Sequence, residues 1–137
     1  MEIKITDNVT DKDIDEIYQQ LKKFNLSKME PSEEIPLGVF MNDDNGVKKA
    51  GLTGETFGNW LCIKYLWVSE DLRGRGIGSQ LLQAAESEAM KRGAKYVFVD
   101  TFSFQAPEFY RKHDYEEVFQ LYEYPYSGSR SYFTKKI

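Results

Sequence analysis

The sequence predicts an α/β fold built on a mixed, mostly antiparallel β-sheet with helices on both faces. Two apolar runs, residues 60–68 and 96–99, flank an amphipathic stretch that begins at Ile77. A strand–helix–strand unit of this kind predicts a parallel strand pair joined by a crossover helix. Hairpin-like pairs of strand patterns precede and follow the unit, and their antiparallel pairing makes the sheet mixed.

The first part of the chain predicts one strand and one helix. Residues 2–6 alternate polar and apolar through Ile3 and Ile5, as a strand does. Thr10 followed by Asp13 matches a capping box, the start signal of a helix. Behind it, apolar residues recur with helical spacing and form one stripe: Ile14, Ile17, Tyr18, Leu21 and Phe24. The polar residues 25–34 then predict a loop.

A β-hairpin is predicted next. Residues 35–41 and 47–57 have strand character and flank the sequence NDDNG. The Asn45-Gly46 pair favours a two-residue type I′ turn, in which both central residues have positive φ. We therefore expect two antiparallel strands joined by a tight turn.

The central strand–helix–strand unit has its own internal signals. Residues 60–68 are almost continuously apolar, which predicts a strand buried on both faces, and residues 96–99 predict another buried strand. Between them, the helix that begins at Ile77 should end near Gly93, because glycine is favoured just after a helix. Glu86 and Glu88 are expected at exposed positions of this helix.

The C-terminal part predicts a short helix and a second hairpin. The helix covers residues 106–113, with Pro107 near its start, where proline is tolerated. Two strands are expected near residues 116–124 and 130–137. No repeat, low-complexity tract or linker interrupts the chain, so a single domain over residues 1–137 is expected.

Composition limits the classes of function. The chain is 41% hydrophobic and 29% charged, which is typical of a globular protein, and its formal net charge of −4 argues against nucleic acid as a partner. No run of eighteen apolar residues predicts a membrane span, and the charged N-terminus does not predict a signal peptide. With Cys62 as the only cysteine, we expect a cytoplasmic protein. His113, the only histidine, is expected on the surface of its helix, and no metal site is predicted.

The sequence LRGRGIG, residues 72–78, lies between the apolar run and the helix. Backbone amides at a helix N-terminus converge on an anion, and glycines let that anion approach closely. A P-loop would need a lysine after Gly78, and the dinucleotide-binding fingerprint would need a glycine at Ser79. A glycine-rich turn with solvated arginines is the remaining alternative to an anion-binding loop.

Two motifs together resemble the GNAT superfamily of acyl-CoA N-acyltransferases. The pattern Arg73-x-x-Gly76-x-Gly78 resembles the loop that binds the acyl-CoA pyrophosphate in that superfamily. The later stretch APEFYRKHDY, from Ala106 to Tyr115, resembles the motif A-x-x-x-Y-x-K-x-G-F. Two departures occur: Ser103 stands where many members have asparagine, and Asp114 replaces the glycine of the second motif.

The resemblance implies acetyl transfer from acetyl-CoA to a primary amine of a small molecule or peptide, by direct attack in a ternary complex. It also implies a central parallel strand pair that splays apart to admit the cofactor, and a backbone N–H that polarises the thioester. Tyr110 matches the tyrosine that protonates the leaving thiolate. The cofactor-binding residues implied in this way are Leu66, Trp67, Val68, Arg73, Gly74, Arg75, Gly76, Ile77, Gly78, Ser79, Ser103 and Tyr110.

The sequence does not decide which group is the general base or which residues bind the acceptor. Glu55 is the first candidate base, Asp100 the second, and a relay through water is an alternative to both. Trp60, Tyr65 and Asp100 are the candidate acceptor-binding residues, and carboxylates with aromatic faces favour a cationic amine. A non-catalytic acyl-CoA-binding module is the alternative function. No nucleic-acid or membrane partner is expected, and a homodimer is left open.

Overall fold

A computed structural model describes residues 1–137 as two compact units, Met1–Ser32 and Glu33–Ile137. The first unit contains helix α1 (Asp11–Leu26). The second contains a six-stranded sheet and the remaining helices. None of the helices combines the length and the apolar composition needed to cross a lipid bilayer.

The start of helix α1 confirms the predicted capping box. The Asp13 amide donates to Thr10 Oγ1 at 3.1 Å, and the Thr10 amide donates to Asp13 Oδ2 at 3.0 Å. These hydrogen bonds favour the ionised carboxylate and hold the pKa of Asp13 below its usual value. Within its own unit, no residue of α1 is buried.

The strand predicted over residues 2–6 is absent, and that prediction was wrong. Ile3 and Ile5 are almost fully exposed, and no strand pairs with this segment. An alternating pattern of only two apolar residues cannot form a strand by itself, because a strand needs the backbone groups of a neighbour.

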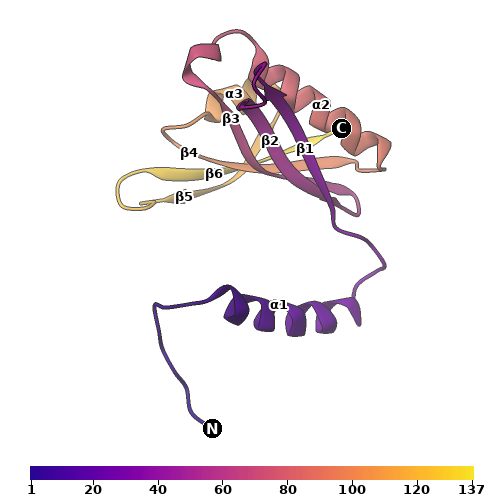
Figure 1. Cartoon of the computed structure of the whole chain (residues 1–137), viewed down its shortest axis with the longest axis vertical. Helices are drawn as coiled ribbons and strands as arrows, with labels where there is room; N and C mark the ends of the chain where they lie inside the picture. Colours follow the sequence, from indigo (N-terminus) through magenta and orange to yellow (C-terminus); the bar gives the residue numbers. More distant parts are fainter. The chain divides into compact units, whose positions relative to one another are not determined.

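The second unit confirms the mixed, mostly antiparallel sheet. Its strands are β1 (Ile35–Asn42), β2 (Lys48–Phe57), β3 (Trp60–Val68), β4 (Tyr96–Phe102), β5 (Glu116–Tyr122) and β6 (Ser129–Lys136). They lie in the order β1-β2-β3-β4-β6-β5 (Figure 1). The β3–β4 pair is parallel and every other neighbouring pair is antiparallel.

The turn between β1 and β2 differs from the predicted type I′ turn. Gly46 has a φ of +80°, but Asn45 does not have positive φ. The Asp43 side chain organises the loop instead, because its Oδ1 accepts hydrogen bonds from the amides of Asn45 and Val47, both at 2.9 Å. Aspartate side chains favour local turns of this kind. The type I′ prediction considered only the Asn45-Gly46 pair and not the side chain of Asp43.

Helices α2 (Ile77–Lys91) and α3 (Pro107–Lys112) pack on the same face of the sheet, whereas helices had been expected on both faces. Phe133 of β6 is fully buried on this face and contacts Tyr110 of α3. Helix α2 contributes Leu82 and Ala85 to the same core. Gly93, with a φ of +92°, follows the last turn of α2, as its sequence position predicted.

Strand β3 is not buried on both faces, contrary to the prediction. Leu61 and Ile63 are buried, whereas Tyr65 is 76% exposed and Trp67 is 51% exposed. The physical reason is that Tyr65 and Trp67 pair with Thr53 and Gly51, on the face of the sheet that α2 and α3 do not cover. In addition, β3 pairs with β4 only from Trp60 to Cys62, after which the two strands diverge. The apolar run therefore lines an opening in the sheet, and the predicted splay of the parallel pair is present.

The residue after α3 offers a test of backbone strain. Asp114 has a φ of +67°, the left-handed region that glycine adopts without cost. We expect Asp114→Gly to raise the free energy of unfolding by about 0.5–1 kcal/mol, because the left-handed conformation costs a residue with a Cβ about that much or more. Urea denaturation measures this change. Asp114→Ala is the control and should be destabilising; a glycine variant less stable than the native protein would contradict the argument.

Candidate active site

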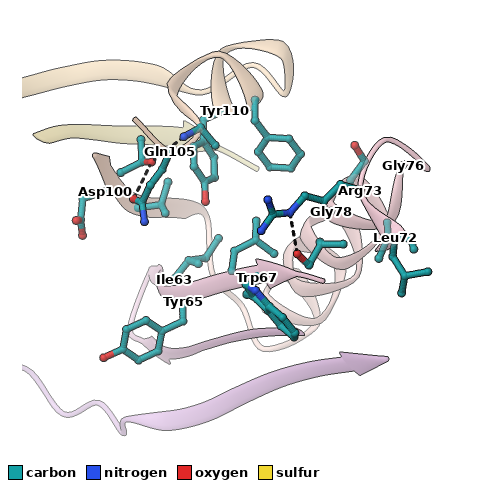
Figure 2. Close-up of a pocket in the computed structure, with 18 of the residues that line it drawn as sticks. Ile63, Tyr65, Trp67, Leu72, Arg73, Gly76, Gly78, Asp100, Gln105 and Tyr110 are labelled. Atoms are coloured by element: carbon teal, nitrogen blue, oxygen red, sulfur yellow. Dashed lines mark hydrogen bonds between the residues drawn. The ribbon is translucent and has the colours of Figure 1, made fainter. Parts of the chain in front are cut away.

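A pocket of about 910 Å³ lies where β3 and β4 diverge (Figure 2). The C-terminal half of β3 forms one wall, and the end of β4 with α3 forms the other. The loop that precedes α2 lies at one end. The lining residues are Ile63, Lys64, Tyr65, Leu66, Trp67, Val68, Leu72, Arg73, Gly74, Gly76, Ile77, Gly78, Ser79, Val99, Asp100, Thr101, Phe104, Gln105, Ala106, Phe109 and Tyr110. Its volume is at the upper end of the range for ligand-binding pockets.

The glycine-rich loop has the geometry of an anion-binding helix N-terminus. Gly74 and Gly76 both have a φ of +77°, and Gly76 is the residue just before α2. The amides of the first helical turn, from Ile77 to Ser79, have no partner within the helix. A side chain at Gly74 or Gly76 would meet nothing within 4 Å. The glycines are therefore required by the backbone conformation, and open space lies beside them.

Arg73 ties this loop to the end of β3. Its Nε donates to the backbone carbonyl of Val68 at 3.1 Å, which Figure 2 shows as a dashed line. The side chain lines the pocket, so its remaining N–H groups lie near any anion that the loop holds. Arg75 lies outside the pocket lining.

Tyr110 of α3 lines the same pocket, and its side chain is buried. Its ring packs against Phe109, Tyr115 and Phe133. Figure 2 shows its hydroxyl pointing toward the β3 side of the pocket. Burial, and the negative charge of Asp100 to a lesser extent, raise the pKa of Tyr110 to about 12. The phenol is therefore a neutral hydrogen-bond donor at every physiological pH.

The turn after β4 contains a pocket residue that sequence reasoning missed. Gln105 lines the pocket, and its Oε1 accepts a hydrogen bond from the Phe102 amide at 2.9 Å. Ser103, predicted to bind the cofactor, lies outside the lining and exchanges hydrogen bonds with the backbone of Ser129. The motif comparison predicted Ser103 as a cofactor-binding residue. The sequence signal that could have indicated Gln105 is that it is a polar residue in the same turn, two positions later.

The carboxylate that lines the pocket is Asp100. Arg130 of β6 holds it through a bond from Nε to Oδ2 of 2.6 Å. The guanidinium also donates to the Tyr124 hydroxyl at 3.1 Å and lies over the rings of Phe102 and Tyr132. These contacts fix Asp100 at the end of the pocket, and sequence spacing did not indicate the partnership with Arg130.

Glu55 and Trp60 are not among the residues that line this pocket. Glu55 of β2 pairs at 3.4 Å with Lys64, which does line it. Trp60 stacks on Tyr96 where β3 and β4 are still paired, with ring centroids 4.9 Å apart. The predicted residues that the pocket brings together are Tyr65, Leu66, Trp67, Val68, Arg73, Gly74, Gly76, Ile77, Gly78, Ser79, Asp100 and Tyr110. The structure contains no group of three or more histidine, cysteine or acidic side chains arranged to hold a metal ion.

A splayed parallel strand pair beside a glycine-rich helix N-terminus is the arrangement that the resemblance to acyl-CoA acyltransferases implied, and comparison with known proteins gives the family. A family model described as an acetyltransferase (GNAT) domain matches residues 37–117, more than half of the chain. The chain belongs to the GNAT family of acetyltransferases.

Known relatives agree with this assignment. An acetyltransferase of Agrobacterium fabrum is 36% identical over 106 residues, 77% of each chain. The blasticidin-S acetyltransferase of Streptomyces morookaense is 35% identical over 97 residues, 68% of this chain and 71% of the relative. The crystal structure of an acetyltransferase from Bacillus cereus is 33% identical, covers 98% of both chains and superposes with a TM-score of 0.83.

Proposed function

We propose that this acetyltransferase transfers the acetyl group of acetyl-CoA to a primary amine of a small molecule or peptide, by direct attack in a ternary complex. One observation carries the proposal: a single pocket connects the glycine-rich loop, the diverging strands and the buried Tyr110 hydroxyl. The reaction requires a site for the anionic pyrophosphate of the cofactor, which the loop offers, and a proton donor for the leaving thiolate, which Tyr110 offers. We also propose that residues 1–137 act as a single acetyltransferase domain.

The loop end fits the pyrophosphate of the cofactor. The amides of residues 74–79 provide donors, and the dipole of α2 favours negative charge at its N-terminus. Arg73 adds a fixed positive charge there. The exposed backbone of β3 from Leu66 to Val68, unpaired on the β4 side, offers hydrogen-bonding groups to the pantetheine arm. Acetyl-CoA supplies an activated thioester when it is bound.

Tyr110 and Asp100 supply the acid and the acceptor contact. Tyr110 keeps its proton until the thiolate leaves and then donates it, because its pKa is raised to about 12. Asp100 replaces Glu55 as the carboxylate that meets the acceptor, since it lines the pocket and Glu55 does not. Asp100 binds the ammonium form of the amine, and a proton then passes from the amine to Asp100 or through water. The blasticidin-S acetyltransferase, named for a small molecule, supports a small acceptor.

Release of free thiol from acetyl-CoA in the presence of a panel of amines tests this function. The panel should contain cationic aromatic, cationic aliphatic, neutral and anionic members at matched concentrations. We expect thiol release together with an acetylated amine, identified by mass spectrometry, for at least one cationic member. Acetyl-CoA binding without thiol release for any amine would favour the alternative, a non-catalytic acyl-CoA-binding module. Turnover with anionic or neutral amines alone would contradict the assignment of Asp100.

Gly76→Val tests the cofactor site on its own. The variant forces a β-branched residue into positive φ and places its methyl groups in the open space beside the loop. We expect CoA affinity, measured by calorimetry, to fall by at least about tenfold, because the free loop relaxes out of the left-handed conformation and binding must then restore it at about 1–2 kcal/mol. Gly46→Val is the matched control, since Gly46 has a similar φ of +80° in the β1–β2 turn, outside the pocket. Equal affinity in the Gly76 variant and the native protein would refute the loop assignment.

A further inference from the structure

A hydrogen bond joins the anion-binding loop to the end of helix α3. Ser79 Oγ and His113 Nε2 lie 2.8 Å apart, and both side chains are half-buried. Ser79 belongs to the first turn of α2 and lines the pocket, whereas His113 is the residue that ends α3. His113 was expected on the helix surface, and the structure instead places its ring against the loop.

Packing fixes the imidazole in this position. The Phe109 ring contacts the His113 ring, with centroids 4.8 Å apart. Phe109 also covers Gly78, where an added Cβ would lie 3.3 Å from the phenyl ring. The His113 amide donates to the Tyr110 carbonyl at 3.0 Å, which sets the backbone. The backbone hydrogen bond and the contact with Phe109 together hold the imidazole beside the first turn of α2.

We propose that His113 is a positioning residue that directs the Ser79 hydroxyl toward the pyrophosphate of acetyl-CoA. This inference rests on the proposed function. A hydroxyl has one hydrogen and two lone pairs. When Nε2 carries a hydrogen and donates it to Ser79 Oγ, the hydroxyl hydrogen is free to point into the pocket and donate to an anion.

Without this partner, the Ser79 hydroxyl has a competing local acceptor. A serine in the first turn of a helix can donate to the carbonyl three residues earlier, which here belongs to Gly76, the residue just before α2. With the opposite imidazole tautomer, Nε2 would accept the Ser79 hydrogen and turn lone pairs toward the anion. Binding of a phosphate therefore selects the form of His113 that carries its hydrogen on Nε2. His113 acts through Ser79 and not by direct contact with the cofactor.

Calorimetric CoA binding to four variants tests the inference. Ser79→Ala and His113→Leu each remove the bond, and the leucine keeps apolar contact with Phe109. We expect CoA affinity to fall about ten- to a hundredfold in each, as for loss of a hydrogen bond to a charged group. The double variant should be no weaker than either single variant, because the two residues act as one unit. His113→Gln places an amide donor near the position of Nε2 and should recover most of the affinity.

The single histidine of the chain provides a spectroscopic readout on the native protein. In ¹⁵N-labelled protein, CoA should shift the His113 Nε2 resonance toward the value of a protonated nitrogen, and Ser79→Ala should remove most of this shift. Native affinity in His113→Leu, independent effects that multiply in the double variant, or an unchanged Nε2 resonance would each overturn the inference. A native protein that binds no CoA would overturn the proposed function as well, so the two failures are distinguishable.

Discussion

Replacing Tyr110 with phenylalanine is expected to lower kcat by about 10²-fold and to leave acetyl-CoA affinity nearly unchanged. The ring packs against Phe109, Tyr115 and Phe133, and phenylalanine keeps all three contacts. What is lost is the proton donor for the departing thiolate. Because the pKa of Tyr110 is about 12 and that of a thiol is about 8.5, the proton transfer is uphill, so the effect belongs at the lower end for a positioned acid.

The pH profile gives the same prediction a second observable. A raised pKa means that Tyr110 stays protonated well above neutral pH, so its ionisation should not reduce kcat between about pH 8 and pH 10. Tyr115→Phe is the matched control, since Tyr115 belongs to the same aromatic cluster but lies outside the pocket. Steady-state kinetics with the acceptor found in the amine screen measures both variants. An unchanged kcat with a raised KM for acetyl-CoA would make Tyr110 a binding residue instead.

Replacing Lys135 with methionine is expected to destabilise the protein by about 1–3 kcal/mol, the cost of leaving a buried acceptor without its partner. Glu86 of α2 was expected at an exposed position, but it is buried, and that prediction was wrong. Lys135 Nζ lies 3.1 and 2.9 Å from the two carboxylate oxygens, and the Tyr115 hydroxyl donates to one of them at 3.3 Å. Without the lysine, the buried carboxylate has no cation.

Urea denaturation of paired variants separates this effect from loss of packing. Lys64→Met is the control: its ion pair with Glu55 is more exposed than the pair of Lys135 with Glu86, with the Lys64 side chain 51% exposed, so we expect a change below about 1 kcal/mol. Combining Lys135→Met with Glu86→Gln should restore much of the lost stability, because the buried charge is then gone. If Lys135→Met costs no more than Lys64→Met, the buried pair does not stabilise the fold.

Local patterns predicted the elements in which sequence and structure agree. The capping box at Thr10 and Asp13, the crossover unit and the glycine at position 93 each depend on residues close together in the chain. The failed strand over residues 2–6 depended on a neighbour that a local pattern cannot supply. Likewise, the apolar run in β3 predicted burial on both faces, although α2 and α3 cover only one of them.

The same distinction applies to the site. The loop residues and Tyr110 could be predicted, because each belongs to a continuous motif. The partnerships of Asp100 with Arg130 and of Ser79 with His113 join residues about thirty positions apart, and only the strand order and the α3 packing bring them together. Glu55 was proposed as a base from its neighbourhood in sequence, but its position on β2 places it beside Lys64 and outside the pocket.

A crystal structure of the protein grown with CoA tests the cofactor assignment most directly. We predict that the pyrophosphate lies on the amides of residues 74–79 and that the pantetheine arm passes between β3 and β4. The sulfur should lie within hydrogen-bonding reach of the Tyr110 hydroxyl. CoA bound elsewhere on the chain, or bound here with its sulfur remote from Tyr110, would contradict the proposed chemistry.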